Sequence, residues 1–194
     1  MSESIYEVEI EITEDLLGTI SKNKEVYATY IASKAAEIEQ REEEISTVTE
    51  IEERGWTGFH TDDKGPFLYD YVVKGFLCES ARTLKQFGAL KQLQDKFKRY
   101  VFVTPRRIRL PQIAEKPLER PLRAMTAQGP RVTVTRSDVV TAGARLVFQV
   151  TILDGAGITQ KCLEKVLDYG KYMGLGQWRS GGFGRFKVIR VDEV

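Results

Sequence analysis

The chain contains few of the residues that build metal sites and disulfide frameworks. Among its 194 residues there are two cysteines and one histidine. Cys78 and Cys162 lie far apart in helix-like contexts, which indicates free, buried thiols in a reducing compartment. A structural zinc ion needs about four nitrogen or sulfur ligands, and these residues are too few. We therefore expect neither a metal site nor a cofactor.

Long apolar runs are also missing. No run reaches the roughly 20 residues that a membrane-spanning helix requires. The first residues, MSESIYEVEIEI, lack the basic and apolar regions of a secretory signal peptide. The GxxxxGK(S/T) motif of P-loop nucleotide-binding proteins is absent as well. These absences favour a cytoplasmic protein without a membrane partner.

Charge is distributed unevenly along the chain, although the net charge is +1. Residues 1–63 carry 17 acidic and 5 basic side chains, a balance of −12. Residues 96–145 carry 12 basic and 3 acidic side chains, a balance of +9. Such asymmetry indicates an electrostatic partner. The basic segment could face the phosphates of a nucleic acid, the acidic part of its own chain, or the acidic part of a second copy in a head-to-tail oligomer.

The most distinctive segment is residues 174–187, which read GLGQWRSGGFGRFK. Glycine allows positive φ angles and lets backbone N–H groups approach a ligand closely. Arginine binds phosphate, and aromatic rings offer faces to nucleic-acid bases. The segment is therefore typical of a loop that holds a polyanion, although a glycine-rich turn beside a β-hairpin has the same composition.

The pattern of apolar residues predicts strands mixed with helices. Apolar residues alternate with glutamates in residues 5–12 and with polar residues in 145–153, as in half-buried strands. Spacings of three and four predict helices over 24–46 and 75–98, and Thr159 is a candidate N-cap for a helix that ends at Tyr172. Further strands are expected at 67–73, 100–104, 131–135 and 186–191.

This order predicts a single α+β domain over residues 1–194, with a ferredoxin-like antiparallel sheet covered by helices on one face. Two insertions interrupt it, an acidic helical segment at 23–55 and a basic arm at 105–130. Five of the six prolines lie in the arm, so we expect a rigid irregular excursion rather than a core element. RRM domains share this fold and bind RNA on the sheet, but fold alone does not establish function.

Two segments resemble the RAMP superfamily of CRISPR-associated RNA-binding proteins. Residues 142–153, the helix after them, and LGQWRSGGFGRFKV at 175–188 are similar to the family's C-terminal half, which contains a GxGxxRxxGFGR-like loop. Residues 71–82 resemble the Lys-Gly helix start of the subunits that form the backbone of crRNA complexes, with Asp-Tyr-Val-Val at 70–73 in place of Pro-Gly-Ser-Ser. The runs LDYG, GLGQWR and GRF are similar to small phage- or prophage-encoded proteins.

The resemblance implies RNA binding in antiviral defence, in a bacterial cell or a phage-infected host. It implies that cationic side chains contact phosphates from the helix start and the loop, while Trp178 or Phe183 stacks a base. The arginines of the RRxR run beginning at Arg106 are further candidates to follow a backbone. Each of these residues also has an alternative role as a fold contact, an ion pair or a core aromatic. The candidate nucleic-acid-binding residues are Lys74, Arg82, Arg106, Arg107, Arg109, Trp178, Arg179, Gly181, Gly182, Phe183, Gly184 and Arg185.

Three functions follow as hypotheses. The first is a non-catalytic module that binds single-stranded RNA or DNA and assembles head to tail. The second is a phage-encoded protein that mimics or inhibits a CRISPR effector complex, with the acidic segment 37–53 imitating nucleic acid. The third is a RAMP-type endoribonuclease in which His60 acts as general acid or base, or Asp62 and Asp63 hold a divalent ion. We expect a binding protein rather than an enzyme, because the sequence does not identify a second catalytic group to act with His60 and the two aspartates lie in a turn signal.

Overall fold

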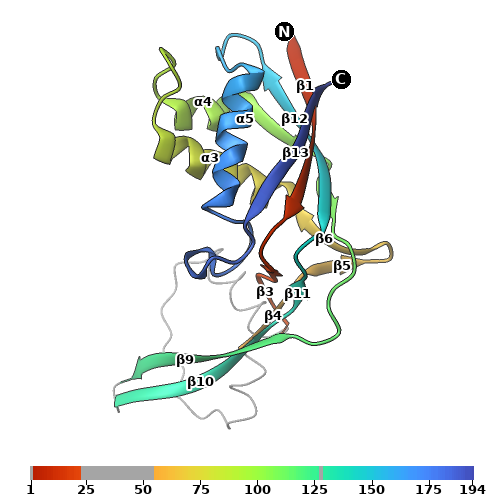
Figure 1. Ribbon diagram of the computed structural model, residues 1–194, viewed down its shortest axis with the longest axis vertical. Coiled ribbons are helices and arrows are strands. Elements are labelled where there is room, and N and C mark those ends of the chain that lie inside the picture. The colour runs from red at the N-terminus through yellow and green to blue at the C-terminus, as the bar shows by residue number, and fades with distance from the viewer. Residues whose placement is uncertain (1, 23–54, 127–128) are drawn as a thin grey trace, which may run out of the picture. The chain divides into compact units, whose positions relative to one another are not determined.

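The computed structural model describes residues 2–22, 55–126 and 129–194 (Figure 1). Contacts divide it into two compact units, the first formed by Met1–Leu16, His60–Ile113 and Val140–Val194, the second by Leu17–Phe59 and Ala114–Val139. The predicted helix at 24–46 and the acidic segment 37–53 lie outside the described residues. The second unit includes most of the two predicted insertions, and their place within a single domain stays a prediction.

A four-stranded sheet organises the first unit, in the spatial order β13-β1-β12-β7. Every neighbouring pair of strands is antiparallel. A helical segment connects β1 to β7 and a second connects β12 to β13, and the helices lie on one side of the sheet (Figure 1). This βαββαβ order is that of a ferredoxin-like fold, so the predicted fold class is confirmed. The elements are β1 (Glu3–Ile12), α3 (Asp70–Leu84), α4 (Leu93–Tyr100), β7 (Val101–Thr104), β12 (Arg145–Leu153), α5 (Gln160–Asp168) and β13 (Phe186–Glu193).

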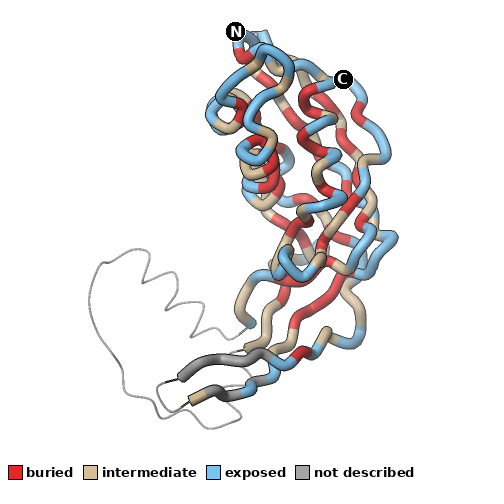
Figure 2. Tube along the Cα trace, turned by 60° about the vertical axis from the view of Figure 1, so that its left-hand side comes forward, coloured by how far each residue is buried: buried red, intermediate tan, exposed pale blue. Residues whose placement is uncertain are grey.

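Alternation along the strands separates a buried face from an open one. In β1, Val8, Ile10 and Ile12 are fully buried, whereas the intervening glutamates are partly exposed. Figure 2 shows the same alternation of buried and less buried positions along the strands of this unit. The helices cover the buried face, where the rings of Phe76 in α3 and Phe186 in β13 meet edge to face with centroids 4.9 Å apart. This face is the core of the unit.

Helix boundaries differ from the sequence prediction at two places. The strand expected at 67–73 ends at Tyr69, and α3 begins at Asp70, whose side chain accepts a hydrogen bond from the Tyr71 N–H group. The helix expected at 75–98 is divided into α3 and α4, because the intervening loop contains the positive φ angles of Lys85, Gly88 and Gln92. The start of α5 is confirmed, since the Thr159 hydroxyl accepts a hydrogen bond from the N–H group of Cys162.

A small antiparallel sheet lies beside the start of α3 in sequence and belongs to the same unit. It has the order β5-β6-β8, with β5 (His60–Asp62), β6 (Gly65–Tyr69) and β8 (Arg107–Arg109). The β5–β6 turn is tight, with Asp62 paired to Gly65 at φ +106°. This sheet therefore places the arginines of the RRxR run opposite the aromatic residues of β6.

The second unit contains a sheet of order β3-β4-β10-β9, with β3 (Ile20–Ser21), β4 (Trp56–Gly58), β9 (Leu118–Thr126) and β10 (Gly129–Ser137). A two-stranded sheet joins β2 (Leu16–Leu17) and β11 (Val139–Val140). The prediction of an irregular arm at 105–130 is wrong in part, because β8 and β9 lie within it. Pro121 lies in β9, which is an edge strand, the position in a sheet where proline is tolerated.

Candidate nucleic-acid interface

Backbone contacts close the glycine-rich loop at its base. The N–H group of Leu175 donates to the carbonyl of Gly184 at 2.9 Å, and the N–H group of Gly184 donates to the carbonyl of Asp15 at 2.8 Å. Gly184 has a φ angle of +70°, and a Cβ atom there would lie 2.0 Å from the carbonyl oxygen of Leu175. Glycine at this position is therefore required for closure of the loop, which explains part of the glycine signal without a ligand.

Two aromatic rings stack within the loop. Trp178 and Phe183 have centroids 5.1 Å apart and ring planes inclined by 16°. Trp178 is 41% exposed and has a left-handed backbone at φ 53°. A Cβ atom on Gly181 would lie 2.8 Å from the Trp178 ring, whereas Gly182, at φ +90°, has the guanidinium of Arg185 as its nearest group. The indole thus rests on the loop itself with part of its surface in solvent.

Glu79 on α3 joins two of the candidate arginines. Its Oε1 atom lies 3.2 Å from Nη2 of Arg82, one helical turn away, and its Oε2 atom lies 3.0 Å from Nη1 of Arg179 in the loop. The sequence prediction did not include Glu79, although its spacing of three residues from Arg82 is a signal for an ion pair. The structure therefore brings Arg82 and Arg179 to one carboxylate.

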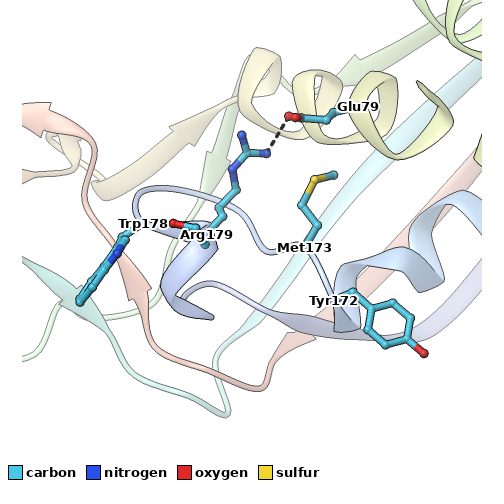
Figure 3. A pocket seen from close by; sticks show the side chains of 6 residues that line it. Glu79, Tyr172, Met173, Trp178 and Arg179 are labelled. Carbon is cyan, nitrogen blue, oxygen red and sulfur yellow. Dashed lines mark hydrogen bonds and ion pairs between the residues drawn. The ribbon is translucent and has the colours of Figure 1, made fainter. Parts of the chain in front are cut away.

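A cavity of about 500 Å³ opens beside this ion-pair group. Figure 3 shows Arg179 extending from the loop toward Glu79, with Trp178 and Tyr172 on either side of the pair. Tyr172 is 63% exposed, so the cavity has an aromatic rim beside the ion pair of Arg179 and Glu79. It is lined by Glu79, Tyr172, Met173, Trp178, Arg179 and Ser180.

Arg185 differs from the other basic residues of the loop. Its side chain is half-buried, and its buried Nε atom has no hydrogen-bond partner. Within residues 2–22, 55–126 and 129–194 it forms no ion pair. Lys187, by contrast, lies 2.7 Å from a carboxylate oxygen of Glu11. A buried donor without an acceptor is unfavourable, so Arg185 is suited to receive an anion.

Lys74 is engaged within the fold. Its ammonium group donates to the backbone carbonyls of Phe97, Lys98 and Val101, at the C-terminal end of α4. A cation at this end of a helix is favoured by the helix dipole. Burial lowers the pKa of Lys74 from its ordinary value. This placement corresponds to the fold contact that the sequence left open as the alternative for Lys74.

The arginines of the RRxR run pair with carboxylates of their own unit. Arg107 and Arg109 both contact Asp62, at 2.7 Å and 2.5 Å, and Arg106 contacts Asp70 at 2.5 Å. The hydrogen bond from Arg109, followed by that from Arg107, holds the pKa of Asp62 far below its ordinary value. Part of the basic segment therefore faces acidic groups of its own chain.

The candidate catalytic residues do not converge. The His60 ring stacks on Phe67 with centroids 5.6 Å apart, and burial lowers the pKa of the imidazole. Asp62 is occupied by two arginines, and Asp63 is exposed in the adjoining turn. No group of three or more His, Cys, Asp or Glu side chains that would suit a metal ion occurs within the described residues.

The open face of the ferredoxin-like sheet carries ion pairs. Glu7, Glu9 and Glu11 project from the central strand β1, and they contact Arg145, Lys187 and Arg190 at distances from 2.6 to 3.5 Å. An RNA-binding sheet of the RRM type instead presents aromatic side chains on its central strands. The loop and α3 are therefore better suited to a polyanion than this face.

Comparison with solved structures identifies a similar fold. A chain in the cryo-EM structure of the Type III-B Cmr-beta complex bound to cognate target RNA matches with a TM-score of 0.56 and 13% sequence identity. The likeness shows the fold. The match covers 99% of this chain and 61% of the other, so this chain spans less than two thirds of that neighbour's length. No family profile and no curated protein matches the sequence. None of the helices in the described part of the chain has the length and hydropathy to cross a membrane.

Proposed function

We propose that this chain is a non-catalytic, RAMP-type module that binds single-stranded nucleic acid, RNA in the first place, at the glycine-rich loop. One observation carries the proposal: Glu79 pairs with both Arg82 and Arg179, and Glu79 and Arg179 line an open cavity with an aromatic rim. Two guanidinium groups share one carboxylate, so the group keeps a net positive charge. Its side chains are already positioned before a ligand arrives.

The chemistry of the cavity fits one nucleotide unit. A guanidinium has five N–H donors, and Glu79 uses few of those on Arg82 and Arg179. The remaining donors suit the oxygens of a phosphate, which arginine binds in a planar, bidentate manner. A base of the same nucleotide would stack on the exposed surface of Trp178. Arg185 supplies a further cation at the loop.

The fold supports RNA as the ligand, because the similar chain belongs to a complex bound to target RNA. Assembly with further copies, or with a CRISPR effector complex, is part of the same prediction and is tested by light scattering with and without an RNA oligonucleotide. The hypothesis of nucleic-acid mimicry depends on the acidic segment 37–53, which lies outside the described residues. The endoribonuclease hypothesis gains no support from the positions of His60 and Asp62.

The test compares two double variants that remove equal charge. Fluorescence anisotropy with a labelled single strand is measured over a salt series for the original protein, for Arg82→Ala with Arg179→Ala, and for Arg145→Ala with Arg190→Ala. We expect the first variant to weaken binding and to reduce the slope of log K against log salt by about 0.7 for each lost phosphate contact. The second removes cations from the open sheet face and should retain the original slope. Absence of binding at low salt, or equal losses in both variants, contradicts the proposal.

A further inference from the structure

We infer that Tyr69, Tyr71 and Arg106 form a second contact for the same strand, at which an unpaired base stacks on Tyr71. This group, the tyrosine–arginine stack, lies between β6 and the start of α3. The inference rests on the proposed function, and it adds that the ligand must present unpaired bases at a site separate from the loop.

The rings form a row that leads from the core to solvent. Phe67 is 3% exposed, and its ring meets that of Tyr69 edge to face at a centroid distance of 5.1 Å. Tyr69 in turn stacks on Tyr71 at 5.3 Å with an angle of 20° between the planes. Tyr71 is the next ring of the row and is 50% exposed. A flat, half-exposed ring in such a row is a platform to which one more planar group can be added.

A guanidinium accompanies the two outer rings. The Arg106 guanidinium lies 5.0 Å from the centroid of Tyr69 and 5.6 Å from that of Tyr71. Asp70 fixes this guanidinium through an ion pair of 2.5 Å, and Asp62 fixes Arg107 and Arg109 in the neighbouring strand. The side chains are therefore held in place, so that little conformational entropy is lost when a ligand binds.

The composition of this surface identifies the class of ligand. The surface carries three guanidinium groups and the two carboxylates of Asp62 and Asp70. Its net charge is therefore positive where the rings are exposed. The turn residues Asp63 and Lys64 add one charge of each sign. Rings beside cations are the combination that holds single-stranded nucleic acid, because every base has a π face and each nucleotide carries a phosphate. Bases in a duplex are already stacked and would not be available.

The experiment separates stacking from charge. Binding of the original protein, Tyr71→Ala and Tyr71→Phe is measured against a single-stranded oligonucleotide and against an abasic strand of equal length. Phe102→Ala serves as the control, because Phe102 is 48% exposed on β7, outside both sites. We expect Tyr71→Ala to weaken binding of the base-bearing strand by at least about fivefold and to leave the abasic strand unaffected. Tyr71→Phe keeps the ring and should bind like the original protein.

Each outcome decides one question. If the original protein binds no strand, the proposed function fails. If it binds and Tyr71→Ala binds equally well, the stack is not a base platform, while the loop proposal stands. If Tyr71→Ala also binds the abasic strand more weakly, the stacking role is overturned, since this result indicates disturbed charge or folding. As a check that does not depend on a variant, fluorescence of a 2-aminopurine oligonucleotide is measured with the original protein, and an unchanged signal at saturation contradicts the inference.

Discussion

Glu79 and Arg179 lie 100 residues apart in the chain, and their side chains meet at 3.0 Å. The pair ties the glycine-rich loop to helix α3, while the other oxygen of Glu79 contacts Arg82. One acidic side chain thus positions two cations that the sequence suggested separately. The ion pairs are partly exposed, so each contributes at most about 1 kcal/mol to stability. Their main effect is to hold the two guanidinium groups at one carboxylate beside the cavity.

Glu79→Gln should strengthen binding of a single strand at low salt. The amide keeps a hydrogen-bond acceptor for the arginines but removes the negative charge that a phosphate must approach. We expect a higher affinity, a steeper dependence on salt, and a change of less than about 1 kcal/mol in the free energy of unfolding. Glu9→Gln, on the open sheet face, is the matched control and should change binding less. Weaker binding by Glu79→Gln would contradict this prediction and show that positioning of the arginines by the carboxylate outweighs the charge that it removes.

Gly184→Ala should destabilise the protein, because a methyl group there meets the carbonyl oxygen of Leu175 at 2.0 Å and φ is +70°. We expect a loss of more than about 1 kcal/mol in the free energy of unfolding, measured with urea. Gly75→Ala is the matched control: nothing lies within 4 Å of the new methyl group inside α3. Alanine should stabilise that helix by up to about 1 kcal/mol. Equal effects of the two variants would contradict the role of Gly184 in loop closure.

The ferredoxin-like fold could be predicted from the sequence because its signals are local. The alternation in residues 5–12 and the cap at Thr159 depend on neighbours within one turn or one strand, and both were confirmed. The site depended on long-range pairs, which no periodicity encodes. The contacts of Arg109 with Asp62, and of Lys74 with the end of α4, became visible when distant segments came together. Basic residues that suggested phosphate therefore have partners inside the protein.

The same limit applies to the strand predicted at 67–73. Aromatic and β-branched residues favoured a strand throughout, but Val73 is buried on the inner face of α3, so packing decides against local propensity. The prolines led to the opposite error, in which a strand was not predicted. They predicted irregular structure at 105–130, whereas an edge strand tolerates Pro121. The tyrosine–arginine stack was missed because Tyr69 and Tyr71 meet Arg106 only through this arrangement.

Asp62 should make the stability of the protein depend on acidic pH. Its pKa in the folded state lies far below the ordinary value of 3.8, chiefly because Arg109 donates to the carboxylate. The stabilisation is therefore complete above the unfolded-state pKa, and it decreases as the pH falls below about 3.9 toward the folded-state pKa. We expect Asp62→Asn to lower the urea midpoint at pH 7 and to lose less stability than the original protein between pH 5 and pH 3. Asp63→Asn, in the same turn, should follow the pH dependence of the original protein. A parallel pH dependence in Asp62→Asn would show that the Asp62 ion pairs do not contribute.

Lys74→Met tests whether a cation of the candidate set serves folding or binding. The ammonium group donates to three carbonyls at the end of α4, and its removal leaves these acceptors with fewer partners. We expect a loss of roughly 1–3 kcal/mol in the free energy of unfolding, because hydrogen bonds of a charged donor are lost. The slope of log K against log salt for a single strand should remain that of the original protein. Lys85→Met, at the exposed C-terminal end of α3, removes the same charge without these bonds and should leave stability within about 0.5 kcal/mol. A reduced salt slope with unchanged stability in Lys74→Met would instead assign Lys74 to the phosphate contacts implied by the RAMP resemblance.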